Sequence, residues 1–297
     1  MTATSGVLAA RPALGTAAML LNTLLIPMMA VGIKSLTELG MATLEMLAIR
    51  SWITLGLLLP LLVFAANIRA LRRADLKAHL VHAAFTITTM ACFYFALRTL
   101  PIVTVTAINF TTPMFTLMLG WLLFGERVAV RGWLALLLGF AGTVLVLRPD
   151  TSGIGLDAAV VLFGSLTAAG MNLAVRRMPA RSTNYAVLFY FSLAGAIVYG
   201  AAGAPVMTWP RAEEIGWLFG LAAIALAVHT CTTIAYRLAA SLVVGALDYL
   251  RIVWAALIGY LAFGEVPDAL DWTGAGMIVA SGLIVLQLSL PRRREPV

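Results

Sequence analysis

The chain has 297 residues, of which 62% are hydrophobic and 11% are charged, with a mean hydropathy of +0.98 and a formal net charge of +7. Soluble globular domains carry about 25% charged residues. This composition therefore excludes a soluble protein and indicates one that lies in a lipid bilayer. The basic residues are spread over short connecting segments, so the positive charge does not indicate a nucleic-acid site.

Ten apolar stretches meet or approach the roughly 20 residues that a helix needs to cross a bilayer. They are Ala13–Ile33, Ala42–Phe64, Ala78–Leu97, Ile102–Phe124, Gly132–Leu147, Gly155–Val175, Thr183–Gly203, Glu214–Tyr236, Ala240–Phe263 and Trp272–Leu290. The strands of a membrane barrel would instead alternate apolar and polar residues over segments of about ten. The sequence therefore predicts an all-α membrane protein with ten transmembrane helices.

The connecting segments differ in charge. If the N-terminus is cytoplasmic, most Lys and Arg residues fall on cytoplasmic segments, whereas Glu265, Asp268 and Asp271 fall outside. Short loops rich in Lys and Arg stay in the cytoplasm. We therefore expect both termini to be cytoplasmic in a bacterial-type inner membrane. No cleavable signal peptide is expected, because Met1–Ala10 contains no basic residue.

A block in the first half of the chain recurs in the second half. Leu122–Glu126 returns as Leu261–Glu265, and the same constant shift holds without a gap back to Ala91. About ten of the roughly 36 aligned positions are identical, which predicts two copies of one five-helix unit, over residues 13–147 and 155–290. Because five is odd, the second copy enters the membrane upside down. Such inverted repeats are typical of secondary transporters.

The residues around this block resemble a known family. Gly120–Glu126, Gly132, Trp133 and Gly139–Gly142 are similar to the end of an EamA domain, and the second copy ends in Gly259–Glu265, Gly274 and Gly282. Two such domains form the ten-helix branch of the drug/metabolite transporter superfamily, and the chain is most similar to YddG-type exporters of aromatic and other neutral amino acids. The resemblance implies a central cavity formed mainly by spans one, three, four, six, eight and nine.

Charged side chains inside the bilayer are costly, so each is a candidate for function. Asp248 and Arg251 lie three residues apart on the ninth span and share a face. They can bind a zwitterion, or they can neutralise each other in a structural ion pair. For Arg50 on the second span, a role as a structural anchor is preferred to a role as a ligand contact. Glu45 is interpreted as a hydrated residue near the surface.

Polar residues on other spans extend this set. The third span presents His82, Thr86, Thr89 and Phe93 as one stripe, which is expected to face protein or water, and Pro113 on the fourth predicts a kink or hinge. The candidate substrate-binding residues are Asn22, His82, Thr86, Thr89, Phe93, Asn109, Thr112, Asn172, His229, Tyr236, Asp248 and Arg251. Asn22, Asn172 and His229 have an alternative role as partners in hydrogen bonds between helices, worth about 0.6 kcal/mol each.

Asn109 is equivalent to Asp248 in the repeat, which favours a common cavity for the two. Aromatic surface for a substrate side chain is expected from Phe93, Tyr94, Tyr236 and Trp254. The fifth and tenth spans instead carry small residues at four-residue spacing, which let helices approach closely. We expect these two spans to be scaffold, with an oligomer contact as the alternative, and the chain to be a monomer.

These features predict a secondary transporter that exports small zwitterionic metabolites by alternating access. Aromatic and other neutral amino acids are the first candidate substrates. Another metabolite or a drug-like cation is the alternative within the same class. A membrane scaffold and an intramembrane enzyme are alternatives from other classes, although the sequence lacks Gly-x-Ser-x-Gly and His-Glu-x-x-His motifs. We expect no cofactor and no metal, since His79 and His82 lack a third ligand.

The energy source is left open between two alternatives. No nucleotide-binding motif is present, so ATP is not expected to drive transport. His82, His229, Glu45 and Asp248 are the candidate proton carriers. Facilitated diffusion is the simpler alternative, because these residues form no obvious relay.

Overall fold

The computed structural model describes residues 12–72, 74–125, 130–147, 155–176, 178–179, 182–238 and 247–289, and within these ranges it contains helices and no β-strand. The α-helices are α1 (Pro12–Glu38), α2 (Thr43–Leu58), α3 (Ala65–Arg72), α4 (Leu76–Ala96), α5 (Ile102–Asn109), α6 (Thr112–Phe124), α7 (Val130–Leu147), α8 (Leu156–Arg176), α9 (Asn184–Gly203), α10 (Ala212–Leu238), α12 (Leu250–Phe263) and α13 (Ala269–Ser289). Two short 3₁₀ helices, η1 (Leu59–Val63) and η2 (Ala204–Val206), extend α2 and α9.

The predicted spans coincide with these helices. Seven helical segments of the described chain are long and apolar enough to cross a membrane, and three shorter apolar helices accompany them. Most predicted ends move by only a few residues. The ninth span differs more, because α12 begins at Leu250 and residues 239–246 lie outside the described chain. The all-α membrane fold is confirmed.

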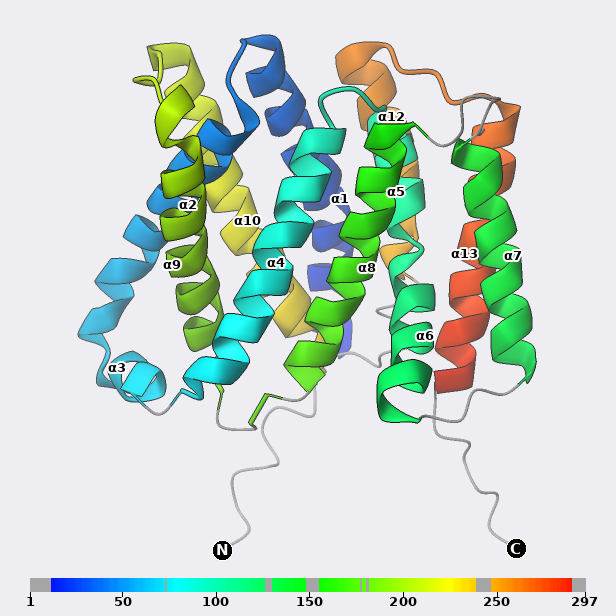
Figure 1. Cartoon of the computed structure of the whole chain (residues 1–297), viewed down its shortest axis with the longest axis horizontal. Helices are drawn as coiled ribbons and strands as arrows, with labels where there is room; N and C mark the ends of the chain where they lie inside the picture. Colours follow the sequence, from blue (N-terminus) through cyan, green and yellow to red (C-terminus); the bar gives the residue numbers. More distant parts are fainter. Residues whose placement is uncertain are drawn as a thin grey trace, which may run out of the picture.

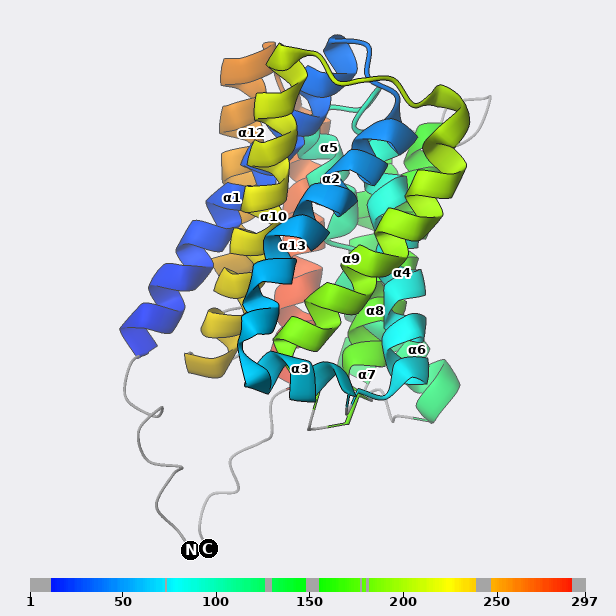
Figure 2. The same cartoon turned by 90° about the vertical axis from the view of Figure 1, so that its left-hand side faces the viewer.

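The helices lie side by side and run between two ends of the molecule (Figure 1). α1 begins and α13 ends at one end, here named the terminal end, and the opposite end is named the far end. α2 and α9 lie at one side of the bundle and α7 and α13 at the other (Figure 1). Figure 2 shows α1 and α10 adjacent along their length, consistent with their extensive contact. α5 contacts both α8 and α12.

Helix α3 was not expected from the sequence. It lies across the terminal end, below α2 and α9 (Figures 1 and 2). Its last turn carries Arg69 and Arg72, and exposed Ile68 gives it an apolar side. A short helix with basic and apolar sides suits the boundary between lipid headgroups and acyl chains.

Glycines end the two repeated blocks in the same way. Gly125 follows α6 with φ 64°, and Gly264 follows α12 with φ 66°. Positive φ strains residues with a side chain, and glycine therefore suits these C-terminal caps. The two glycines occupy matching positions of the predicted repeat, so the two blocks end with the same backbone conformation.

The small residues of α7 and α13 bring their backbones together. A Cβ atom added at Gly142 would lie 2.7 Å from the carbonyl oxygen of Gly274, and one added at Gly274 would lie 2.6 Å from that of Gly142. Gly276, in contrast, has open space around it. The close approach therefore uses Gly142 and Gly274, and α7 packs on α13 as expected of a scaffold pair.

Candidate substrate-binding site

The fourth span is broken near the middle of the bundle. α5 ends at Asn109 and α6 begins at Thr112, with Pro113 in the first turn of α6. The N–H of Phe110 donates to the carbonyls of Thr106 and Ala107, and that of Thr111 donates to Ile108 at 2.9 Å, so the last turn of α5 is tightened. The interruption lies just before Pro113, where the sequence predicts a kink. Whether this proline acts as a hinge stays a prediction.

The ninth span is interrupted at the equivalent position. Tyr249 precedes α12 and corresponds to Phe110 in the repeat. The two rings contact each other, with centroids 4.9 Å apart and planes inclined by 44°. The two interruptions therefore meet inside the bundle. Interrupted helices that meet between repeats are a common place for substrate sites in transporters.

Each interruption carries a polar pair at matching positions. Thr112 donates to the side-chain oxygen of Asn109 at 3.0 Å. The equivalent residues in the second half are Arg251 and Asp248, whose charged atoms are 3.5 Å apart. The structure thus brings four predicted site residues to the two interruptions.

The charged pair is not fully enclosed. The side chain of Asp248 is 32% exposed and that of Arg251 is 11% exposed. The Arg251 guanidinium lies 4.7 Å from the centre of the Phe110 ring, within range of a cation–π contact. Its Nε–H has no hydrogen-bond partner among the described residues. Phe110 and Tyr249 belong to this site, and the sequence reasoning missed them, although their equivalence in the repeat was a signal.

The stripe on α4 is buried against protein. Thr89 and Thr167 of α8 share a hydrogen bond of 2.8 Å, and Phe93 packs against α8 near Gly164. Thr86 donates to the carbonyl of His82 at 2.8 Å, and both side chains are buried. The stripe therefore faces protein as expected. Its role in substrate binding stays a prediction.

The remaining predicted residues lie on α1, α8 and α10. Asn22 on α1 is buried and donates to the carbonyl of Val228 at 2.9 Å and to the hydroxyl of Thr232 at 2.7 Å, so it joins α1 to α10. The ring of His229 lies 5.2 Å from that of Phe191. Asn172 is exposed. The Tyr236 side chain lies outside the described part of the chain.

Metal ligands do not gather in the described residues. No group of three His, Cys, Asp or Glu side chains there could hold a metal ion. In the sequence, His79 and His82 form a candidate metal-binding pair. The Nδ1 atom of His79 instead lies 2.8 Å from the carbonyl oxygen of Asp75, and its ring centroid lies 5.0 Å from that of Tyr190.

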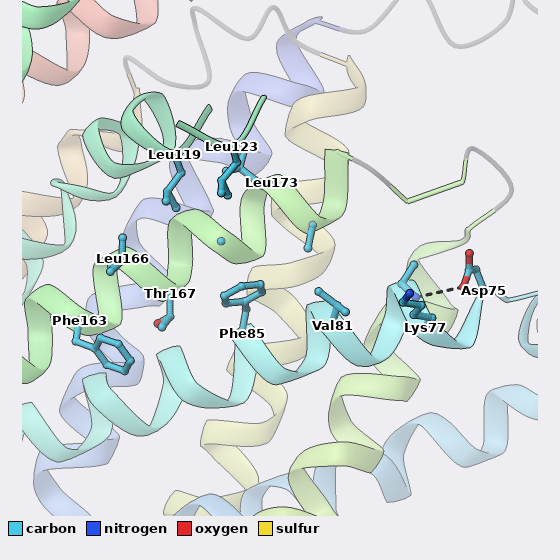
Figure 3. Close-up of a pocket in the computed structure, with 13 residues that line it drawn as sticks. Asp75, Lys77, Val81, Phe85, Leu119, Leu123, Phe163, Leu166, Thr167 and Leu173 are labelled. Carbon is cyan, nitrogen blue, oxygen red and sulfur yellow. Dashed lines mark hydrogen bonds between the residues drawn. The ribbon is translucent and has the colours of Figure 1, made fainter. Parts of the chain in front are cut away.

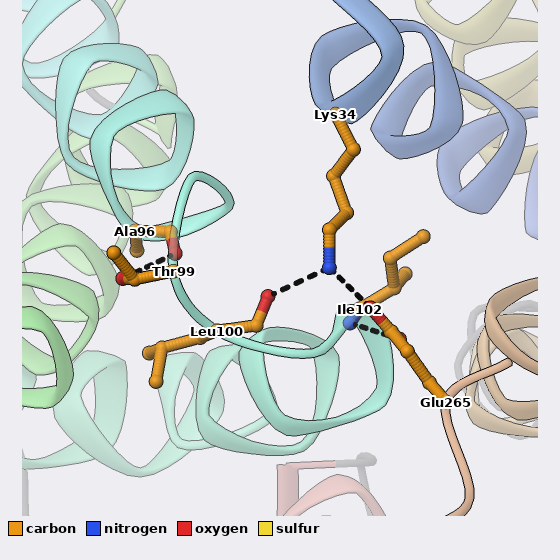
Figure 4. A network of polar contacts seen from close by, with 6 residues as sticks. All are labelled: Lys34, Ala96, Thr99, Leu100, Ile102 and Glu265. Carbon is orange, nitrogen blue, oxygen red and sulfur yellow. Dashed lines mark hydrogen bonds and ion pairs between the residues drawn. The ribbon is translucent and has the colours of Figure 1, made fainter. Parts of the chain in front are cut away.

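An ion pair joins three helices at the far end (Figure 4). The ammonium group of Lys34 on α1 contacts Glu265, which follows α12, and also donates to the carbonyl of Leu100 at 3.3 Å. Glu265 in turn accepts the backbone N–H of Ile102, at the first residue of α5, at 2.8 Å. A carboxylate is favoured at a helix N-terminus by the exposed N–H groups and the helix dipole. Sequence reasoning placed these charges only on external segments.

Two charged residues of α2 are deeply buried. Glu45 is 3% exposed and accepts both the N–H and the hydroxyl of Thr208, at 2.8 and 2.7 Å. The expectation that Glu45 is hydrated was therefore wrong, because the turn after η2 folds over it and supplies its donors. Arg50 is 2% exposed.

Two grooves lie beside the α4–α8 pair, away from the interruptions. The first, of about 640 Å³, lies between α4, α6 and α8 and is lined mainly by apolar side chains such as Phe85, Leu119 and Phe163, with Asp75 and Lys77 at one end (Figure 3). The second, of about 560 Å³, includes Arg98 and Asp157. Neither is lined by a residue of the two interruptions.

Comparison with known proteins agrees with this architecture. Residues 13–148 match the model of the EamA-like transporter family. The first half of the chain therefore carries an EamA-like transporter domain. A solved crystal structure shares the fold with a TM-score of 0.60 at 19% identity, covering 94% of this chain and 97% of the other. The EamA family and the relatives of this chain are transporters rather than enzymes.

The relatives are named for different small metabolites. The chain is 27% identical to a pseudopaline exporter of Pseudomonas aeruginosa, over 76% of this chain and 80% of the relative. It is 23% identical to an S-adenosylmethionine uptake transporter of Rickettsia bellii, over 77% and 78%. A riboflavin transporter of Rhizobium johnstonii is 26% identical, over 84% and 88%. This EamA transporter therefore moves a small metabolite across a membrane.

Proposed function

We propose that this EamA transporter exports small zwitterionic metabolites, with aromatic and other neutral amino acids first among them, across a bacterial inner membrane by alternating access. The observation that supports this most is the contact between the two interrupted helices, where Phe110 meets Tyr249 beside the pair of Asp248 and Arg251. Opposite charges next to aromatic rings match the chemistry of such a substrate.

The geometry of the ion pair favours binding over a purely structural role. Its separation of 3.5 Å exceeds the roughly 2.7–2.9 Å of a charge-assisted hydrogen bond. Asp248 is partly exposed, and the Nε–H of Arg251 is unused among the described residues. A substrate ammonium can therefore bind Asp248 while its carboxylate binds Arg251, and the rings of Phe110 and Tyr249 offer surface to an apolar side chain.

The far-end ion pair supports the alternating-access part of the proposal. Lys34, Glu265 and the first residue of α5 hold α1, α5 and the end of α12 together. Release of this contact would free the three elements to separate at that end. A closed far end and an interruption in each half suit a transporter that exposes one central site to each side in turn.

The proposed direction of transport is export. The relatives include a protein named as an exporter and another named for uptake. Export is proposed because one relative is the pseudopaline exporter of Pseudomonas aeruginosa. The direction is tested by measuring on which side of the vesicle membrane the unlabelled substrate must be present.

The test is counterflow in proteoliposomes that contain the purified protein. Labelled phenylalanine is expected to accumulate against unlabelled phenylalanine. Phenylalaninamide, which lacks the carboxylate, and N-acetylphenylalanine, which lacks the ammonium, are expected not to replace it. Exchange of either derivative at the rate of phenylalanine would contradict zwitterion recognition. Absence of counterflow with every amino acid of a neutral panel would contradict the substrate class.

The energy source is tested in the same vesicles. Facilitated diffusion is proposed, since the candidate proton carriers Glu45, His82 and His229 lie on three separate helices. Flux is then expected to be unchanged by an imposed pH gradient and to need no ATP. Flux that follows the pH gradient would instead indicate proton coupling.

A further inference from the structure

Arg50 is a buried cation that has no anionic partner among the described residues. It extends from α2 toward α4, where its only hydrogen bond among the described residues goes to the thioether sulfur of Met90 at 3.5 Å. The Nε–H of Arg50 has no hydrogen-bond partner in the part of the chain that the structure describes. A guanidinium offers five N–H donors, and a thioether is a weak acceptor. Arg50 therefore keeps most of its hydrogen-bonding capacity unused while it is 2% exposed.

The residues around Arg50 supply donors and aromatic surface. The ring of Tyr94 lies 5.8 Å from the guanidinium carbon, near the limit of a cation–π contact. The Tyr94 hydroxyl is itself buried and has no hydrogen-bond partner among the described residues. Two unsatisfied donors thus belong to one contacting pair.

No acidic side chain in the described part of the chain neutralises this cation. Within the described residues, no carboxylate oxygen lies within 4.0 Å of the guanidinium nitrogens. Glu45, the acidic residue on the same helix, is engaged by Thr208. A buried charge in a membrane protein is costly unless it is paired, and unsatisfied buried polar groups in native proteins indicate an ion or a water that completes the site.

We propose that Arg50 and Tyr94 form an anion-binding site for a carboxylate-sized group, separate from the pair of Asp248 and Arg251. The anion accepts hydrogen bonds from the guanidinium and from the Tyr94 hydroxyl. Two sources share this chemistry: the carboxylate of the transported metabolite, and a free small anion such as acetate or chloride. The site goes beyond the proposed transport function, because it would bind an anion even if the substrate class were different.

Met90 occupies the place that the anion would take. Its sulfur contacts Nη1 of Arg50, and its side chain is only half-buried. Methionine is unbranched and changes rotamer readily, so it can leave the guanidinium without a rearrangement of helices. The site is closed in this conformation and opens when Met90 moves.

Thermal unfolding of the purified full chain tests the site. In a buffer whose only other anion is sulfate, acetate is expected to raise the melting temperature in a concentration-dependent way, whereas neutral acetamide is not. Arg50→Met should weaken the apparent affinity for acetate about tenfold or more, because it removes charge-assisted hydrogen bonds. Tyr94→Phe should weaken it less. Arg98→Met, which changes an exposed arginine, is the matched control and should keep the full shift.

Further arms identify the source of the anion. A shift with phenylalanine but not with phenylalaninamide, lost in Arg50→Met, assigns the site to the metabolite. A shift with chloride or acetate alone, also lost in Arg50→Met, assigns it to a free anion, and both results support the site. An acetate shift that survives Arg50→Met but is lost in Arg251→Met would overturn it while leaving the proposed transport site intact.

The unliganded protein separates this site from a structural anchor. In the sulfate buffer without acetate, Arg50→Met is expected to unfold no earlier than the wild type, because it removes an unpaired buried charge. A large loss of stability in that buffer, together with no acetate shift in the wild type, would overturn the proposal in favour of an anchor.

Discussion

Glu265 is held from two directions, by the ammonium group of Lys34 and by the N–H of Ile102. Side-chain exposures of 15% for Lys34 and 11% for Glu265 show that water screens this pair only in part. An ion pair in such a position contributes more than one on the surface, where the median is about 0–1 kcal/mol. It also connects elements that alternating access requires to separate.

Glu265→Gln is expected to lower the free energy of unfolding by about 1–3 kcal/mol. This loss is smaller than the loss from breaking a fully buried ion pair, because water reaches part of this one. It should also open the far end. In a background with Cys92→Ala and Cys231→Ala, a cysteine at Leu100 should react faster with a membrane-impermeant thiol reagent when Glu265→Gln is present.

Glu213→Gln is the matched control for this change. Glu213 is 60% exposed on its side chain and lies 4.0 Å from Arg211. Thiol labelling at Leu100 should stay at the wild-type rate in this variant. Equal labelling in Glu265→Gln and Glu213→Gln would show that the Lys34 contact does not hold the far end closed.

Asp248→Asn removes the partner of Arg251 and leaves a poorly exposed guanidinium uncompensated. We expect lower thermal stability, by a few kcal/mol at most, because partial exposure reduces the cost for a buried pair. The double variant Asp248→Asn with Arg251→Gln should recover part of that stability and still fail in counterflow. Normal counterflow by the folded double variant would exclude these residues from the substrate site.

At the scale of whole elements, the two interrupted helices organise the molecule. Each has a short polar pair at the interruption, and the aromatic residues there contact each other across the two halves. Interrupted backbone is tolerated at membrane depth where protein surrounds it. Ser165 on α8 illustrates this, because its hydroxyl donates to the carbonyl of Ile108, near the end of α5, at 3.3 Å.

α7 and α13 approach each other closely at Gly142 and Gly274, and this yields a prediction about scaffold residues. Gly274→Ala would place a methyl group 2.6 Å from the Gly142 carbonyl oxygen, so the helices must separate. Overpacking of this kind costs about 1–3 kcal/mol. A lower melting temperature is expected, with counterflow per folded molecule little changed.

Gly276→Ala provides the comparison, since a Cβ at Gly276 meets nothing within 4 Å. Alanine is also the better helix former, by about 1 kcal/mol in a helix interior. This variant should be as stable as the wild type or more so. If both variants lost stability equally, the close approach of α7 and α13 would not be the cause.

For the whole molecule, the arrangement of charges predicts orientation in the membrane. Arg72 lies on α3 at the terminal end, and Asp268 directly precedes α13 at the far end (Figure 1). In the cysteine-free background, a cysteine at Arg72 should be labelled only from the cytoplasm and one at Asp268 only from outside. A cysteine at Arg293, outside the described residues, should behave like that at Arg72.

External labelling at Arg72 would reverse the proposed orientation. Labelling of Arg72 and Asp268 from the same side would contradict the arrangement of the helices as well. The two results are distinguishable because the impermeant reagent is applied to intact cells and to inverted vesicles in parallel.

The class of protein and the repeat follow from the amino-acid sequence alone. Hydropathy predicts the spans because hydrocarbon admits about 20 apolar residues in a helix whatever their neighbours are. The constant shift between the two copies predicts equivalence of the halves, and Gly125 and Gly264 adopt matching backbones. The pairing of Asp248 with Arg251 also followed from local spacing, since residues three apart share a helix face.

The packing of the helices determines what each isolated polar residue contacts. Asn22, a candidate ligand in sequence, joins α1 to α10, and Lys34 reaches Glu265 from the other half of the chain. Glu45 accepts hydrogen bonds from Thr208. Arg50, on the same helix, contacts no anionic side chain among the described residues. Sequence spacing fixes only neighbours within one helix. Partners on other helices depend on packing, and this is why burial, pairing and the proposed anion site emerged only from the folded chain.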